Sequence, residues 1–161
     1  MNLQEVRSKI LEKLLRFDFL MDGKENEEDA GPIQLIFTDG TVLEIDLVPD
    51  GESVEYKWKI KEEEKESGWF KIDLTDKKPF IQLRDMKILD YDELLFGTIE
   101  GWQESIVIAG IGFQFENGMS LIYYNAGDFA KVYINEMPPA FDGQFKLVWK
   151  NGKFQDIKTG N

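Results

Sequence analysis

The sequence predicts an α+β fold that is predominantly antiparallel β-sheet with an N-terminal amphipathic helix. Two observations predict this class. Apolar residues recur at steps of three and four along residues 2–17, which is the helical period. From Ile33 onward they alternate with polar residues, and Asp-Gly or Asn-Gly dipeptides separate the runs, as in antiparallel hairpins. A chain of 161 residues can bury one full core, so a single domain over residues 1–161 is expected.

The predicted helix covers residues 2–17. Its apolar stripe consists of Leu3, Val6, Ile10, Leu14 and Phe17. Asn2 followed by Glu5 is a plausible capping box, because the Asn side chain accepts an early amide and Glu reaches back. We expect this helix to pack on the protein's own sheet; a helix that binds a partner or a membrane surface is the alternative.

Residues 22–32 are almost wholly polar and end in Gly-Pro, which indicates a mobile loop. Two hairpins follow, around Asp39-Gly40 and Asn117-Gly118, and a third is expected around Asn151-Gly152, joining 145–149 to 154–157. Further strands are predicted at 54–60, 70–74, 80–83, 106–115 and 132–134, and a short helix at 90–96.

The first two hairpins indicate an internal repeat of a three-stranded meander, near 33–56 and 111–134. A shift of 78 residues places Ile33 on Ile111, Leu35 on Phe113, Phe37 on Phe115, Gly40 on Gly118, Leu43 on Leu121, Asp50 on Asp128 and Val54 on Val132. The alternative is that any two amphipathic hairpins look alike, because alternation and a turn dipeptide already fix half of these matches.

The composition excludes much of the usual site chemistry. The chain has no His and no Cys, so it offers no disulfide, thiolate nucleophile, imidazole base or Cys/His metal site. A net charge of −12 opposes binding to nucleic acid and to anionic membranes. We expect no catalytic residue, no metal and no cofactor, and therefore not an enzyme.

The acidic residues fall in two blocks. Residues 17–56 carry a net charge of −11 and residues 88–145 a net charge of −8, and each block contains one predicted repeat. This arrangement favours a surface that attracts a basic protein partner, although a merely solubilising surface is the alternative. The candidate partner-binding residues are Asp90, Asp92, Glu93, Glu100, Trp102, Glu104 and Tyr124. Alternation turns Tyr124 away from the core, so it is either exposed or part of a sheet covered on both faces.

The run from Ile111 to Asp128 resembles a hairpin found in small immunity proteins of bacterial polymorphic-toxin systems. It has an amphipathic strand, an Asn-Gly turn, a Leu-containing return strand and then Gly127-Asp128. The resemblance covers about thirty residues. It implies a non-enzymatic protein that neutralises a cognate toxin by binding it, and it transfers no binding residue to this chain.

Two other function classes stay open. A small-molecule or carbohydrate-binding domain, or a carboxylate-based hydrolase, would be favoured by a cleft lined by Trp102, Tyr123 and two carboxylates. A scaffold would be favoured by an evenly charged surface. The N-terminus lacks the basic and apolar regions of a signal peptide, so a cytoplasmic location is expected. The sequence does not fix the oligomeric state.

Overall fold

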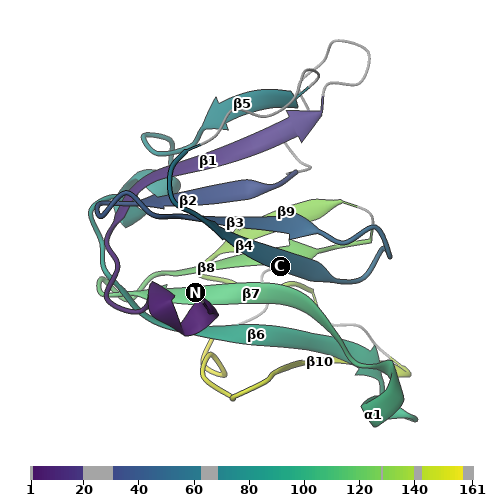
Figure 1. Cartoon of the computed structure of the whole chain (residues 1–161). Helices are drawn as coiled ribbons and strands as arrows, with labels where there is room; N and C mark the ends of the chain where they lie inside the picture. Colours follow the sequence, from purple (N-terminus) through teal and green to yellow (C-terminus); the bar gives the residue numbers. More distant parts are fainter. Residues whose placement is uncertain (1, 20–30, 63–68, 128, 140–142, 158–161) are drawn as a thin grey trace.

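The computed structural model of the chain describes residues 2–19, 31–62, 69–127, 129–139 and 143–157. Within these ranges, ten strands form two five-stranded sheets, and every neighbouring pair of strands is antiparallel. The sheets lie one above the other in Figure 1. The predicted predominance of antiparallel sheet is therefore confirmed for the described part of the chain.

Each sheet comes from one continuous half of the described chain. The first has the order β4-β3-β2-β1-β5, with β1 (Leu11–Phe19), β2 (Ile33–Phe37), β3 (Val42–Leu47), β4 (Val54–Lys59) and β5 (Trp69–Asp73). The second has the order β10-β6-β7-β8-β9, with β6 (Ile88–Thr98), β7 (Val107–Phe115), β8 (Ser120–Asn125), β9 (Ala130–Ile134) and β10 (Phe145–Trp149). In both, four strands follow in chain order and the fifth returns to pair with the first.

The main core lies between the two sheets. Its fully buried members include Leu35, Phe37, Leu43 and Ile45 from the first sheet and Ile111, Phe113, Phe115, Leu121 and Tyr123 from the second. These residues alternate along β2, β3, β7 and β8, so the period of two in the sequence marks the inner faces. Burial of this apolar surface is the main force that holds the sheets together.

The two hairpins of the sequence pattern fall in different sheets and pair in the same register. Ile33 pairs with Ile45, and Ile111 pairs with Tyr123, so the shift of 78 residues holds for both strands of each hairpin. Gly40 and Gly118 adopt the positive φ that these turns require, +89° and +85°.

The third strand of each meander departs from that shift. Ile45 pairs with Tyr56 in β4, but Tyr123 pairs with Val132 in β9, two residues earlier than the shift gives. Val132 therefore occupies the place of Tyr56 rather than that of Val54. Asp128, the other distant match, lies outside the described residues. A gene duplication stays a prediction.

Residues 2–17 do not form the predicted amphipathic helix, so the α+β class is wrong. Leu3–Val6 form one turn of 3-10 helix, η1, and β1 begins at Leu11. Leu14 is buried in the main core, whereas the adjacent Leu15 is buried in a cluster on the other face of β1. A strand buried on both faces, with a bulge between Leu11 and Lys13, reproduced the spacing of a helix.

Three other local predictions are also wrong. Residues 90–96 belong to β6, where the register shifts between the apolar neighbours Leu94 and Leu95. Residues Phe80–Leu83 form a 3-10 helix, η2, whose three-residue period places both end residues against the core. Residues 154–157 form turns, and β10 pairs with β6 instead. The predicted loop at 22–32 lies outside the described residues except for Gly31 and Pro32.

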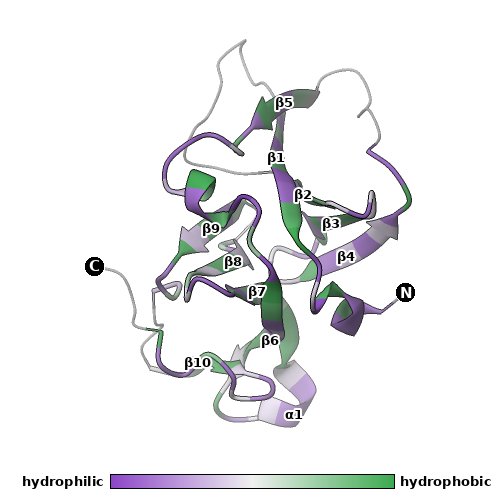
Figure 2. Ribbon diagram, turned by 90° about the vertical axis from the view of Figure 1, so that its left-hand side faces the viewer, coloured by the Kyte–Doolittle hydropathy of each residue, from purple (hydrophilic) through white to green (hydrophobic). Residues whose placement is uncertain are grey.

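The segment 150–157 covers the outer face of the second sheet. The Phe154 ring packs edge-on against Trp149, with centroids 4.8 Å apart. The fully buried carboxylate of Asp92 accepts hydrogen bonds from Asn151 N at 3.0 Å and Lys153 N at 3.2 Å. The second sheet is therefore buried on both faces, and Tyr124 lies in this outer cluster. Figure 2 shows hydrophobic residues along β6, in contrast to the mostly hydrophilic edge strand β4.

Candidate functional site

Three loops lie at the same end of the two sheets, which we call the loop end. They are residues 48–53 between β3 and β4, residues 99–106 between β6 and β7, and residues 126–127 after β8. The loop at 99–106 contains the short helix α1 (Trp102–Ser105), and all three lie toward the right of Figure 1. Asn125 Nδ2 donates to Ser53 O at 3.0 Å, which ties the first sheet to the second.

The loop end carries exposed carboxylates. Asp50, Glu52, Glu100 and Glu104 are all exposed, and the described residues of the three loops include no Lys or Arg. Hydrogen bonds from the Ser53 side chain and from the backbone of Ser53 and Glu52 hold the pKa of Asp50 below its usual range. The loop end is therefore a local concentration of negative charge at neutral pH.

An aromatic hollow of about 290 Å³ opens at the loop end, and Glu52 stands at its lip. Phe96 of β6 and Phe145 of β10 form its wall, with rings stacked at 5.4 Å and an angle of 12°. Phe145 is 36% exposed. Tyr124 also lines the hollow, and none of the described residues lining it is basic. We call this the loop-end hollow.

Four of the sequence candidates lie at the loop end: Glu100, Trp102, Glu104 and Tyr124. Glu100 and Glu104 are exposed on the β6 to β7 loop. Tyr124 is only 4% exposed. Burial, followed by the neighbouring Tyr133, raises the pKa of Tyr124 to about 12, so it presents a neutral ring to the hollow.

Trp102 is half-buried and has partners within the chain. Its ring packs over Gly97, where an added Cβ would lie 3.0 Å from Trp102 Cζ3. Lys146 Nζ lies 4.5 Å from the centre of the same ring, a cation–π contact. The cleft that would favour a sugar site does not form around it, because Tyr123 is fully buried in the core and donates to Gly31 O at 3.0 Å.

The remaining candidates lie away from the loop end: Asp92 is fully buried and accepts hydrogen bonds from Asn151 and the Lys153 amide, whereas Asp90 and Glu93 have basic partners. Asp90 is ion-paired with Arg7 at 3.0 Å and Lys153 at 2.8 Å, and Glu93 lies 3.9 Å from Lys150. Partial desolvation pushes the pKa of Asp90 upward, but the hydrogen bonds from Lys153, the Tyr91 amide and Arg7 outweigh it and lower the pKa.

Sequence reasoning missed Glu52, Phe96 and Phe145. Glu52 belongs to the acidic block 17–56, so its charge was visible in the sequence. Nothing in the sequence indicated that Phe145 stacks on Phe96, because this contact depends on β10 pairing with β6 across a long connection.

The chain matches no protein-family model, no curated protein and no solved structure. Among the described helices, none has the length and apolar character needed to cross a membrane. The argument for function therefore rests on the site itself.

Proposed function

We propose that the chain is a non-enzymatic binding protein that neutralises a basic protein toxin through its loop end. The observation that carries this proposal is an aromatic hollow lined by Glu52, at the end of the sheets whose loops carry four exposed carboxylates. Protein interfaces commonly combine aromatic anchors with a charged rim. The acidic rim accelerates association with a basic partner, and the hollow limits its dissociation.

The chemistry of the loop-end hollow suits a basic side chain of the partner. Arg and Lys bind aromatic rings through cation–π contacts and bind carboxylates through charge-assisted hydrogen bonds. Phe96 and Phe145 offer the rings, and Glu52 offers the carboxylate. Asp92 is fully buried and Asp90 and Glu93 are ion-paired, so we assign partner contact to the loop-end carboxylates first.

The immunity class of this binder draws on the resemblance of residues 111–128 and on the charge. A net charge of −12 suits an inhibitor that covers the basic surface of a nuclease toxin, and such an inhibitor acts in the cytoplasm. The partner is then the toxin domain encoded beside this gene.

The test compares association rates of that toxin domain with two triple variants of equal charge. Glu52→Gln, Glu100→Gln and Glu104→Gln together should slow association about tenfold at low salt and flatten its salt dependence. The control triple, Glu5→Gln, Glu12→Gln and Glu116→Gln, changes exposed carboxylates away from the loop end. Equal slowing by both triples would reduce the effect to net charge and contradict a localised site.

The hollow is tested through dissociation. Phe145→Ala removes an exposed ring and should raise the dissociation rate about thirtyfold, because anchor residues contribute about 2 kcal/mol or more. Trp102→Ala provides the comparison, because its ring is held by Gly97 and Lys146. A larger rise in the dissociation rate for Trp102→Ala than for Phe145→Ala would show that the aromatic anchor is Trp102 of α1 and not the loop-end hollow.

Small-molecule binding, the alternative from the sequence, is favoured by a different feature. This feature is a larger cavity along β10, on the outer face of the second sheet.

A further inference from the structure

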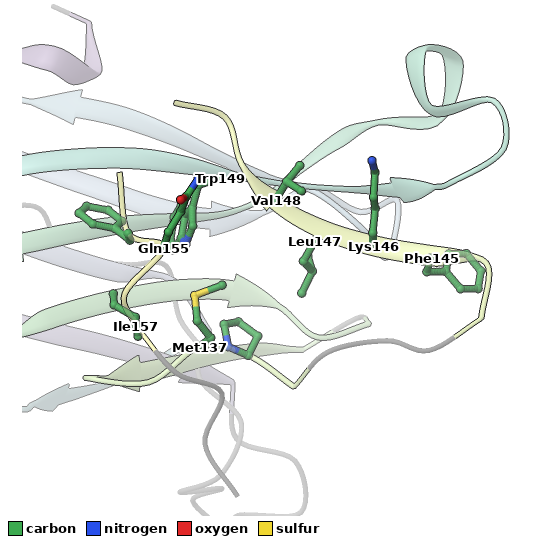
Figure 3. A pocket seen from close by; sticks show the side chains of 10 residues that line it. Met137, Phe145, Lys146, Leu147, Val148, Trp149, Gln155 and Ile157 are labelled. Carbon is green, nitrogen blue, oxygen red and sulfur yellow. The ribbon is translucent and has the colours of Figure 1, made fainter. Parts of the chain in front are cut away.

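A cavity of about 560 Å³ lies between the edge strand β10 and the C-terminal segment. Three stretches of chain line it: Met137 and Pro138 after β9, Phe145 to Trp149 of β10, and Phe154 to Ile157. Figure 3 shows Leu147, Met137 and Ile157 around the open space. The volume falls within the range of about 300–1,000 Å³ that small-molecule sites occupy. We call it the β10 cavity.

Trp149 is fixed in the wall of the β10 cavity by a glycine. An added Cβ at Gly112 would lie 2.6 Å from Trp149 Cη2 and 3.1 Å from Cζ3, so the six-membered ring rests on β7 at this residue. The five-membered ring, which carries Nε1, is then the end nearer to β10. Gly112 and Phe154 together hold the indole in one orientation.

The indole N–H of Trp149 has no acceptor within the part of the chain that the structure describes. Trp149 is 9% exposed, and its Nε1 atom is buried without a hydrogen-bond partner. A buried donor left unpaired costs about 1–3 kcal/mol, and buried Trp side chains usually find a partner. This is a polar group of fixed position in a wall that is mainly apolar, which is the pattern of a ligand site.

The charge of the cavity points to a neutral ligand. Lys146 and Leu147 project to opposite sides of β10 in Figure 3, and the Lys146 ammonium lies over the Trp102 ring instead. The apolar wall consists of Met137, Pro138, Leu147, Phe154 and Ile157. Gln155 also lines the cavity and is exposed, so its side chain can move as a ligand enters.

We propose that the β10 cavity binds a neutral, mainly apolar small molecule with one hydrogen-bond acceptor, which pairs with the indole N–H of Trp149. The apolar body of the ligand contacts Met137, Leu147 and Ile157, and its acceptor supplies the partner that Nε1 lacks. The β10 cavity shares Phe145 with the loop-end hollow, but the contact with Trp149 does not depend on the toxin-binding proposal.

The test uses two probes of similar size on the unmodified protein. Acetophenone carries a carbonyl acceptor, and ethylbenzene does not. In an NMR titration of isotope-labelled protein, acetophenone should bind about three to ten times more tightly, the value of one neutral hydrogen bond. It should also move the indole N–H resonance of Trp149 downfield. Equal binding of the two probes, no binding of either, or an unmoved indole resonance would overturn the proposal.

A conservative variant sharpens the result. Trp149→Phe keeps an aromatic ring in the wall and removes the donor together with one ring of the indole. The lost volume affects both probes, whereas the preference for acetophenone should disappear. Trp102→Phe is the matched control and should keep the preference, because Trp102 does not line the β10 cavity. A preference that survives in Trp149→Phe would assign the acceptor to another group and refute the proposed contact. Loss of toxin binding in the glutamate triple variant would leave all these results unchanged, because Glu52, Glu100 and Glu104 do not line the β10 cavity.

Discussion

The two sheets share strand order and register but differ on their outer faces. At corresponding register positions, the first sheet has Gln34 and Lys71 where the second has Gly112 and Trp149. In the first, Gln34 donates to Glu44 at 3.3 Å, and Glu44 pairs with Lys59 at 3.1 Å. In the second, aromatic residues pack beneath the C-terminal segment. The same topology therefore supports a polar network beside a small cluster of Leu15, Phe17, Ile36 and Val42 in the first half, and an aromatic cluster covered by the C-terminal segment in the second.

The largest expected effect on the free energy of unfolding distinguishes Lys71 of the first sheet from Trp149, which occupies the corresponding position of the second sheet. Trp149→Ala should lower the free energy of unfolding by about 3–5 kcal/mol, because it empties the outer core. Lys71→Ala removes an exposed ion pair with Glu62 and should change it by less than about 0.5 kcal/mol. Denaturant unfolding of both variants measures the difference. Similar small effects would show that the outer cluster adds little stability.

A middle-sized effect is expected at Asp92, which corresponds to Leu15 in the first sheet. Asp92→Asn turns one acceptor into a donor that faces the amides of Asn151 and Lys153, and it should cost about 2 kcal/mol. Hydrogen exchange should show lost protection in residues 150–157 while the first sheet keeps its protection. Asp156→Asn is the control, because Asp156 is exposed on the same segment. Uniform loss of protection would mean that the segment and the sheets unfold together.

The smallest effect concerns alkaline pH. Burial raises the pKa of Tyr123, Tyr124 and Tyr133, all in the second sheet, and that of Tyr124 reaches about 12. A tyrosine with a raised folded pKa stabilises the fold below its unfolded value near 10, and this contribution is lost as pH rises toward 12. Tyr124→Phe should reduce this loss by about 1 kcal/mol, measured by unfolding across that window.

Tyr56→Phe, at an exposed position of the first sheet, is the matched control for the alkaline measurement. If the unmodified protein and Tyr124→Phe lost the same free energy of unfolding between pH 10 and 12, ionisation of Tyr124 would not be the cause of that loss.

The elements that sequence reasoning identified are those with one covered face or a tight turn. Alternation and Asp39-Gly40 were sufficient for the β2 to β3 hairpin, because local geometry decides it. The error at residues 2–17 has a definite cause: Leu14 and Leu15 are buried on opposite faces, so the strand lost its alternation. Strands covered on both faces read as continuous apolar runs and are easily mistaken for helices.

Only the part of the candidate site that depends on local sequence was predicted. Glu100 and Glu104 were candidates because no basic residue lies near them in the sequence, and the structure places both on an exposed loop. Asp90 appeared free of counterions, because Arg7 and Lys153 are 83 and 63 residues away in the chain. Only the pairing of β10 with β6 brings the C-terminal lysines beside these carboxylates. Contacts between distant segments were the part that local patterns could not supply.

The division of the chain into one half per sheet also sets an order of events during synthesis. Residues 11–73 leave the ribosome first and can complete the hydrogen bonds of their sheet while the second half is still being made. The apolar face with Leu35 and Phe37 then has no cover until β7 and β8 emerge. At about 5–20 residues per second, this interval lasts roughly 3–10 seconds. A nascent chain stalled after β5 should therefore be bound by ribosome-associated chaperones and released once β8 has been translated.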